Sequence, residues 1–163
     1  MIDFELKNVF KEIIGKFHSE GLPEIFERDV EIPELKKVNK VFVIMGPRRA
    51  GKTYVLYEVM KRRIEKGAKI ADFLYLNFEN DRISDMKPGQ LGLALEAYNE
   101  LYPGQKPIVF FDEIQNVDGW EKFVRRLNDE GYAIYVSGSN SKLLSREIAT
   151  SLRGRDYPIE VMP

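Results

Sequence analysis

Eight consecutive residues in the first third of the chain match a pattern that binds phosphate groups. They read Gly46-Pro47-Arg48-Arg49-Ala50-Gly51-Lys52-Thr53, which has the spacing G-x-x-x-x-G-K-[ST] of the loop called Walker A. The glycines allow backbone N–H groups to turn inward around phosphate oxygens. The Lys52 ammonium would reach the β- and γ-phosphates of a nucleotide, and the Thr53 hydroxyl would bind Mg²⁺. Together with Tyr54, which follows directly, these residues form the predicted nucleotide-binding set.

The sequence on either side of this loop predicts the two elements that must position it. Residues 40–45 are rich in β-branched and aromatic side chains, as a buried strand should be. After the loop, apolar residues recur at helical spacing as far as Ile64, and Gly67 follows where a helix C-cap belongs. A strand, a glycine loop and a helix in this order place the positive end of a helix dipole beside the bound phosphates.

A pair of acids further along the chain predicts the second half of the site. Residues 107–111 are apolar and are followed by Asp112 and Glu113, the pattern called Walker B. Because ligands of open parallel sheets bind at the carboxyl ends of strands, Asp112 would hold Mg²⁺ and Glu113 would orient and polarise the attacking water. Two acids can also simply end a strand, but their position after Walker A favours the functional roles. Lys52 and Glu113 are therefore predicted to be catalytic.

The order of the elements favours ATP as the nucleotide. Residues 70–78 predict another strand between the two motifs. This order, with a glutamate directly after the metal-binding aspartate, is typical of P-loop ATPases, whereas nucleotide kinases and GTPases usually lack that glutamate. No Asn-Lys-x-Asp motif, which would read guanine, follows a late strand. The predicted cofactors are therefore ATP and Mg²⁺.

Polar residues after the next predicted strand, 132–137, are candidates for sensing the γ-phosphate. Ser139 or Asn140 would face the γ-phosphate or the attacking water, and Asn140 is included among the predicted catalytic residues. Serine and asparagine are also good helix N-caps, and Ser141 fits that role before a helix predicted over 141–149.

Several arginines have roles that the sequence leaves open. In Arg153-Gly154-Arg155, Arg153 is the predicted catalytic arginine, which would stabilise transferred charge at the γ-phosphate of its own or a neighbouring subunit. The alternative is a pair of solvated arginines. Arg48 and Arg49 could grip phosphate, pair with Glu79 or Asp81, or contact a neighbour.

Strands alternate with helices along the chain. The pattern predicts strands over 40–45, 70–78, 107–112, 132–137 and 157–161, with helices over 3–20, after the glycine loop, around 91–102, over 120–130 and over 141–149. Such alternation implies βαβ units and parallel strands. The predicted fold is an α/β P-loop NTPase, AAA-like, with a parallel sheet of about five strands flanked by helices and a catalytic glutamate carried at a strand end.

The N-terminal helix predicted over 3–20 is amphipathic. Its apolar stripe consists of Leu6, Val9, Phe10, Ile13, Ile14 and Phe17, and it would pack on the core of the same domain or bind a partner. His18, near the end of this helix, is expected to be a lone surface histidine. Residues 1–34 are assigned to this helix and a connector, and residues 35–163 to the ATPase core.

Composition narrows the classes of protein further. The 163 residues include no cysteine and carry a net charge of −1, so neither a disulfide framework nor an overall attraction to nucleic acid or membrane is predicted. No run is long and apolar enough to span a membrane, and the basic start of a signal peptide is lacking, so we expect a cytoplasmic protein. Local basic clusters, such as Lys61-Arg62-Arg63, leave DNA binding open.

Taken together, these blocks resemble a known family. The glycine loop, Leu76-Asn77-Phe78-Glu79, the run from Phe111 to Asn116 with Gly119-Trp120, and the runs 137–144 and 152–155 are similar to archaeal and bacterial AAA-type ATPases. Members usually continue into a winged-helix-like region and a nuclease-like C-terminal domain. The resemblance covers residues 35–163, and it implies that the chain is truncated at its C-terminus and works with a missing C-terminal domain or as a homo-oligomer.

The sequence therefore predicts a domain that binds ATP and ADP and hydrolyses ATP with Mg²⁺, driving a conformational change in a downstream domain or partner. One alternative is a nucleotide-dependent module that binds DNA or protein with little turnover. Another is a small-molecule kinase, against which Glu113 and the absence of an obvious acceptor-binding insertion both argue.

Overall fold

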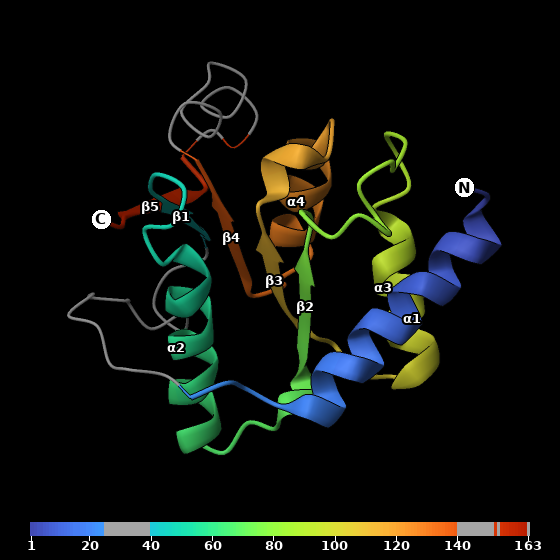
Figure 1. Ribbon diagram of the computed structural model, residues 1–163, viewed down its shortest axis with the longest axis horizontal. Helices are drawn as coiled ribbons and strands as arrows, with labels where there is room; N and C mark the ends of the chain where they lie inside the picture. The colour runs from blue at the N-terminus through green and yellow to red at the C-terminus, as the bar shows by residue number, and fades with distance from the viewer. Residues whose placement is uncertain (25–39, 140–151, 153, 163) are drawn as a thin grey trace.

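The computed structural model describes residues 1–24, 40–139, 152 and 154–162. Within these residues the chain alternates between helices and strands, as the sequence pattern predicts (Figure 1). The elements are α1 (Asp3–Glu20), β1 (Val41–Met45), α2 (Lys52–Glu65), the 3₁₀-helix η2 (Ile70–Asp72), β2 (Phe73–Asn77), α3 (Gly92–Leu101), β3 (Ile108–Asp112), the 3₁₀-helix η3 (Ile114–Asn116), α4 (Trp120–Asp129), β4 (Ile134–Gly138) and β5 (Asp156–Glu160). The helix predicted over 141–149 lies outside the described residues.

The five strands form one parallel sheet in the order β2-β3-β4-β1-β5. The predicted α/β fold with a parallel sheet of about five strands is confirmed. Strand β4 lies between β1, which leads into the glycine loop, and β3, which ends in Asp112. Because all strands run the same way, their carboxyl ends lie at one edge of the sheet, where ligands bind in open α/β sheets.

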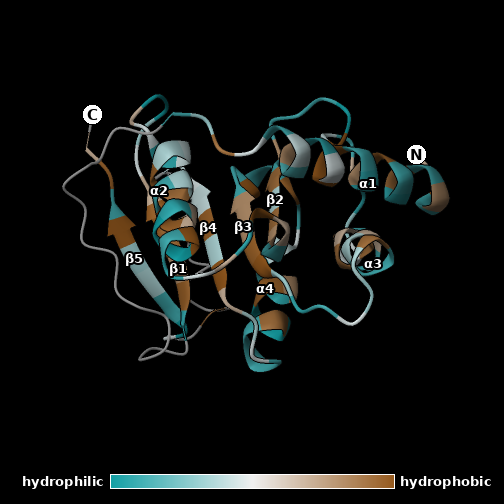
Figure 2. Ribbon diagram, turned by 90° about the horizontal axis from the view of Figure 1, so that it is seen from below, coloured by the Kyte–Doolittle hydropathy of each residue, from teal (hydrophilic) through white to brown (hydrophobic). Residues whose placement is uncertain are grey.

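The sheet is buried on both faces. Side chains that alternate along each strand divide between two cores: Val41, Val43 and Met45 of β1 face the core shared with α1, α3 and α4, whereas Phe42 and Ile44 face the core shared with α2. Figure 2 shows β3 and β4 between α2 and α4, with β3 largely hydrophobic. This double burial explains why the strands read as continuous apolar runs rather than as alternating ones.

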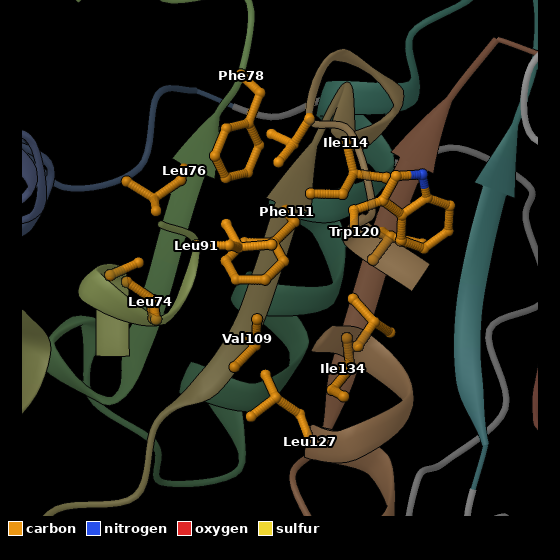
Figure 3. Packing of buried hydrophobic residues seen from close by; sticks show 14 of the residues in the cluster. Leu74, Leu76, Phe78, Leu91, Val109, Phe111, Ile114, Trp120, Leu127 and Ile134 are labelled. Carbon is orange, nitrogen blue, oxygen red and sulfur yellow. The ribbon is translucent and has the colours of Figure 1, made fainter. Parts of the chain in front are cut away.

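The larger core joins β2, β3 and β4 to the helices on one face. Val109 and Phe111 of β3 lie among side chains from β2, such as Leu74, and from α4, such as Leu127 (Figure 3). Trp120, the first residue of α4, is also buried there, at 3% exposed. These contacts fix the end of β3, and with it the acids that follow.

The N-terminal helix packs on this core. Leu6, Phe10 and Ile14 of α1 are buried, and Figure 1 shows α1 lying against α3 beside β2. Two lysines of α1, Lys7 and Lys11, lie 3.3 Å from the Glu100 carboxylate of α3. Of the two predicted roles for the apolar stripe, packing on the domain's own core is the one observed.

The expectation for His18 is wrong. Its ring is half-buried between α1 and the β2–α3 layer, where Nε2 lies 2.7 Å from the carbonyl oxygen of Phe73 and Nδ1 lies 2.7 Å from the hydroxyl of Tyr102. A carbonyl can only accept, so Nε2 carries the proton and Nδ1 accepts from Tyr102. Burial lowers the pKa of this imidazole, against smaller opposing effects of the Phe73 carbonyl and the nearby Asp72 charge.

None of the helices in the described part of the chain is both long and apolar enough to cross a membrane.

Candidate functional site

The loop between β1 and α2 uses two residues with left-handed backbone conformations. Gly51, the N-cap of α2, has φ 94°, and Arg49 has φ 63°, a value that a residue with a side chain adopts only at some cost. Gly51 provides no side-chain cap, so the first backbone N–H groups of α2 remain available to an anion. The loop therefore has the shape and the donors of an anion-binding turn.

Lys52 lies inside this loop rather than extending into solvent. Its side chain is almost completely buried, and Nζ donates hydrogen bonds to the carbonyl oxygens of Gly46 at 2.8 Å and Pro47 at 3.0 Å. The same ammonium lies 3.4 Å from Oε1 of Glu113. The structure thus brings the predicted lysine and the predicted catalytic glutamate into one ion pair.

Asp112 ends β3 beside Thr53. The Thr53 hydroxyl donates a hydrogen bond of 2.7 Å to Oδ2 of Asp112, and the hydroxyl of Tyr75 donates another of 2.7 Å to the same oxygen. Ser137 Oγ donates to the second oxygen, Oδ1. The carboxylate is fully buried, and no lysine or arginine of the described residues forms an ion pair with it.

Glu113 also has a left-handed backbone, with φ 53°. Its N–H donates to Ser137 Oγ at 2.9 Å, and its Oε2 accepts a hydrogen bond of 2.6 Å from the side-chain amide of Gln115. This backbone turn points the Glu113 carboxylate toward Lys52, away from the direction a continuing strand would give it. Strained residues of this kind are concentrated at functional sites.

Lys52, Thr53 and Glu113 border one pocket of about 880 Å³. Its lining comes from the glycine loop, the start of α2, the segment after β2 and the end of β3: Arg48, Arg49, Gly51, Lys52, Thr53, Tyr54, Phe78, Glu79, Ser84, Glu113 and Asn116. At the mouth, the Arg48 guanidinium lies 3.6 Å from the carboxylate of Glu79. Of the roles left open for Arg48, pairing with Glu79 is the one that this structure contains.

The protein oxygen atoms at the pocket could bind Mg²⁺ only together with oxygen atoms from other molecules. Thr53 and Asp112 offer a hydroxyl and a carboxylate oxygen, the ligand types that Mg²⁺ prefers. Among the described residues, no group of three or more His, Cys, Asp or Glu side chains could hold a metal by itself. Further oxygens would have to come from water and from the phosphates of a bound nucleotide.

Two predicted catalytic residues, Asn140 and Arg153, lie outside the described residues. Arg155 is described, and it lies at the opposite edge of the sheet from the glycine loop. Its carbonyl accepts from the N–H of Val41, at the start of β1, and its guanidinium lies 3.0 Å from the Asp129 carboxylate. In this structure the Arg155 side chain is therefore paired with Asp129 and does not line the pocket beside the glycine loop.

Sequence reasoning missed three side chains that contact the acids: Ser137, Tyr75 and Gln115. The predicted candidates, Ser139 and Asn140, follow β4, whereas Ser137, whose hydroxyl donates to Asp112, is inside β4. A lone serine in a buried apolar strand was the available signal, because such a hydroxyl needs a partner. No comparable signal marked Tyr75 or Gln115.

The sheet order, the glycine loop and the acids at the end of β3 define an α/β P-loop NTPase fold of the AAA type. The chain belongs to the AAA domain family, which matches residues 38–163. This is a family of nucleotide-binding ATPases.

The chain is also similar to two longer proteins. An uncharacterized protein of Methanocaldococcus jannaschii is 43% identical over 169 residues, which cover all of this chain and 35% of that protein. An uncharacterized protein of Haemophilus influenzae is 35% identical over 136 residues, which cover 82% of this chain and 34% of that protein. The chain spans about a third of the length of these relatives.

Proposed function

We propose that this chain binds ATP with Mg²⁺ in the pocket beside the glycine loop and hydrolyses it. The observation that carries this proposal is the convergence of four side chains at the carboxyl edge of the sheet. Thr53 donates to Asp112 at 2.7 Å, and Lys52 lies 3.4 Å from Glu113. A hydroxyl, a cation and two carboxylates in this arrangement are the set that Mg²⁺-dependent phosphoryl transfer requires.

Phosphate binding would use the loop and the start of α2. Backbone N–H groups of residues 48–53 would surround the phosphates, with the positive end of the α2 dipole behind them. Lys52 would exchange its bonds to the Gly46 and Pro47 carbonyls for bonds to phosphate oxygens, which are stronger acceptors because they are charged. Thr53 and Asp112 would hold Mg²⁺, which neutralises charge on the phosphates when it is bound.

Glu113 would act as the residue that orients the attacking water. In this structure its two oxygens are engaged by Lys52 and by the Gln115 amide. Once Lys52 turns to the phosphates, Oε1 loses its ion-pair partner and can accept a proton from water. A base at this position favours hydrolysis over the reaction of a kinase, which transfers the phosphoryl group to a small molecule.

Turnover would act on a domain or partner next to the core. The chain that leaves β5 lies against the glycine loop, because Val161 N–H donates to the Met45 carbonyl at 2.7 Å. A Cβ atom on Gly46 would lie only 2.6 Å from the Val161 carbonyl oxygen. Because of this contact, a rearrangement of the loop would displace whatever follows or docks on β5. A C-terminal domain or a second copy of the chain is the proposed recipient.

The test is release of inorganic phosphate from Mg²⁺-ATP by wild type, Glu113→Gln and the matched control Glu130→Gln. Glu130 is exposed at the end of α4 and does not line the pocket. We expect phosphate release from wild type and from Glu130→Gln, and about 10²- to 10⁴-fold slower release from Glu113→Gln. Equal rates for Glu113→Gln and wild type would contradict the role of Glu113, and a phosphorylated acceptor in place of free phosphate would indicate a kinase.

A further inference from the structure

The Asp112 carboxylate is held by hydroxyl groups from three different elements. Thr53 of α2 and Tyr75 of β2 donate to Oδ2, and Ser137 of β4 donates to Oδ1. The carboxylate is fully buried. A buried carboxylate without a cation depends on such hydrogen bonds, and each one to a charged group contributes more than a hydrogen bond between neutral groups.

The donors on β2 and β4 fix the orientation of this carboxylate. Strands β2 and β4 flank β3 on either side, so Tyr75 and Ser137 bind the two oxygens from opposite directions. Rotation of the carboxylate about its Cβ–Cγ bond would break both hydrogen bonds. Thr53 differs from these two because it is itself a proposed metal ligand.

Tyr75 is itself rigidly held. Its side chain is only 8% exposed, and its ring centroid lies 4.9 Å from that of Phe17 in α1 and 5.5 Å from that of Tyr57 in α2. A rigidly held donor on a carboxylate oxygen preorganises that carboxylate for a ligand.

We propose that Tyr75 is a positioning residue for metal binding: its hydroxyl holds the Asp112 carboxylate in the orientation that receives Mg²⁺ with the nucleotide. This inference rests on the proposed function, since it assigns a role within the same site. The alternative is that the Tyr75 hydroxyl only stabilises the fold by pairing with a buried group. The two roles differ in their dependence on Mg²⁺, because a purely structural hydroxyl affects metal-free and metal-bound nucleotide alike.

The experiment compares Tyr75→Phe, which removes only the hydroxyl, with Tyr98→Phe as a matched control. Tyr98 is also buried, but its hydroxyl donates to the carbonyl of Ala71 at 2.6 Å and does not line the pocket. ATP affinity is measured by calorimetry with Mg²⁺ and with EDTA. We expect Tyr75→Phe to bind ATP about tenfold more weakly with Mg²⁺ and unchanged in EDTA, the size of a lost hydrogen bond to a charged group. Tyr98→Phe should match wild type in both conditions.

An affinity of Tyr75→Phe that equals that of Tyr98→Phe, or that falls equally with Mg²⁺ and with EDTA, overturns this inference while the proposed function stands. If wild type itself does not bind Mg²⁺-ATP, both are overturned. Should Tyr75→Phe not fold, Phe17→Leu loosens the ring packing that holds Tyr75, 4.9 Å between ring centroids, and gives the same comparison. A loss of affinity confined to Mg²⁺ then supports the positioning role, and an affinity loss in EDTA or no loss at all overturns it.

Discussion

The Lys52 ammonium and the Glu113 carboxylate lie 3.4 Å apart, both largely buried. These are the cation proposed to bind the phosphates and the base proposed to orient water, and in this structure each partly neutralises the other. Lys52 is held further by the carbonyls of Gly46 and Pro47. ATP binding must therefore compete with an ion pair inside the protein before the site can work.

From this competition we predict that Glu113→Gln binds ATP more tightly than wild type, although it should not hydrolyse it. The substitution frees Lys52 from its ion pair and removes a negative charge beside the γ-phosphate. The expected gain is roughly threefold to tenfold in affinity. Calorimetry with Mg²⁺-ATP measures it, with Glu130→Gln as the reference, and weaker binding by Glu113→Gln would show that the ion pair does not oppose the nucleotide.

Ser137→Ala should destabilise the fold without changing its shape. The Ser137 hydroxyl serves both acids, since it donates to Asp112 and accepts from the backbone N–H of Glu113. Its loss leaves two buried polar groups each short of a hydrogen bond, which we expect to lower the free energy of unfolding by about 1–3 kcal/mol. Urea titration measures this change. Ser19→Ala, which removes an exposed hydroxyl on α1, should change stability little, and equal effects of the two substitutions would contradict the bridging role of Ser137.

Two glycine-to-alanine substitutions should have opposite effects. A Cβ on Gly46 would lie 2.6 Å from the backbone oxygen of Val161, so Gly46→Ala must displace β5 or the loop. A Cβ on Gly15, inside α1, would meet no atom within 4 Å. We expect Gly46→Ala to cost about 1–3 kcal/mol of unfolding free energy and Gly15→Ala to add about 0.5–1 kcal/mol. Thermal denaturation measures both, and a stable Gly46→Ala would disprove the close approach of β5 to the loop.

The stability of the protein should fall in mildly acidic solution because of His18. Its pKa is lowered from 6.5 in the folded state, so the unfolded chain takes up the proton more readily. The contribution of the neutral imidazole is fully present above pH 6.5 and is lost progressively as the pH falls toward the lower pKa of the folded state.

His18 is the single histidine of the chain, which makes this dependence measurable. Between pH 7.5 and 5.5, the free energy of unfolding should fall more for wild type than for His18→Gln. Urea titrations at the two pH values provide the comparison. An equal decrease in the free energy of unfolding for both proteins would mean that protonation of His18 does not oppose folding.

Local patterns in the sequence were sufficient to predict the strand–loop–helix unit around Lys52 and the strand that ends in Asp112. They worked because a phosphate loop needs glycines at fixed spacing and a doubly covered strand needs a continuous apolar run. The parallel sheet followed from the alternation of strands and helices, since a crossover helix is the usual way to join parallel strands.

The two missed contacts with Asp112 join residues far apart in the chain. Tyr75 and Asp112 are separated by 37 positions, and Ser137 and Asp112 by 25. Their pairing depends on the register of β2 and β4 against β3, and a shift of one residue would turn either hydroxyl to the other face of the sheet. His18 was misplaced for a related reason: its partners, Phe73 and Tyr102, come from two later elements that the pattern of α1 alone does not specify.

The most direct test of the account is calorimetric titration of wild type, Lys52→Met and Lys16→Met with Mg²⁺-ATP. Methionine keeps the length of the lysine side chain but removes its charge, and Lys16 is exposed on α1, away from the pocket. We predict one ATP bound per chain by wild type and by Lys16→Met, and affinity at least about tenfold weaker for Lys52→Met. Equal binding by Lys52→Met and wild type, or no binding by wild type, would contradict the assignment of this pocket as the nucleotide site.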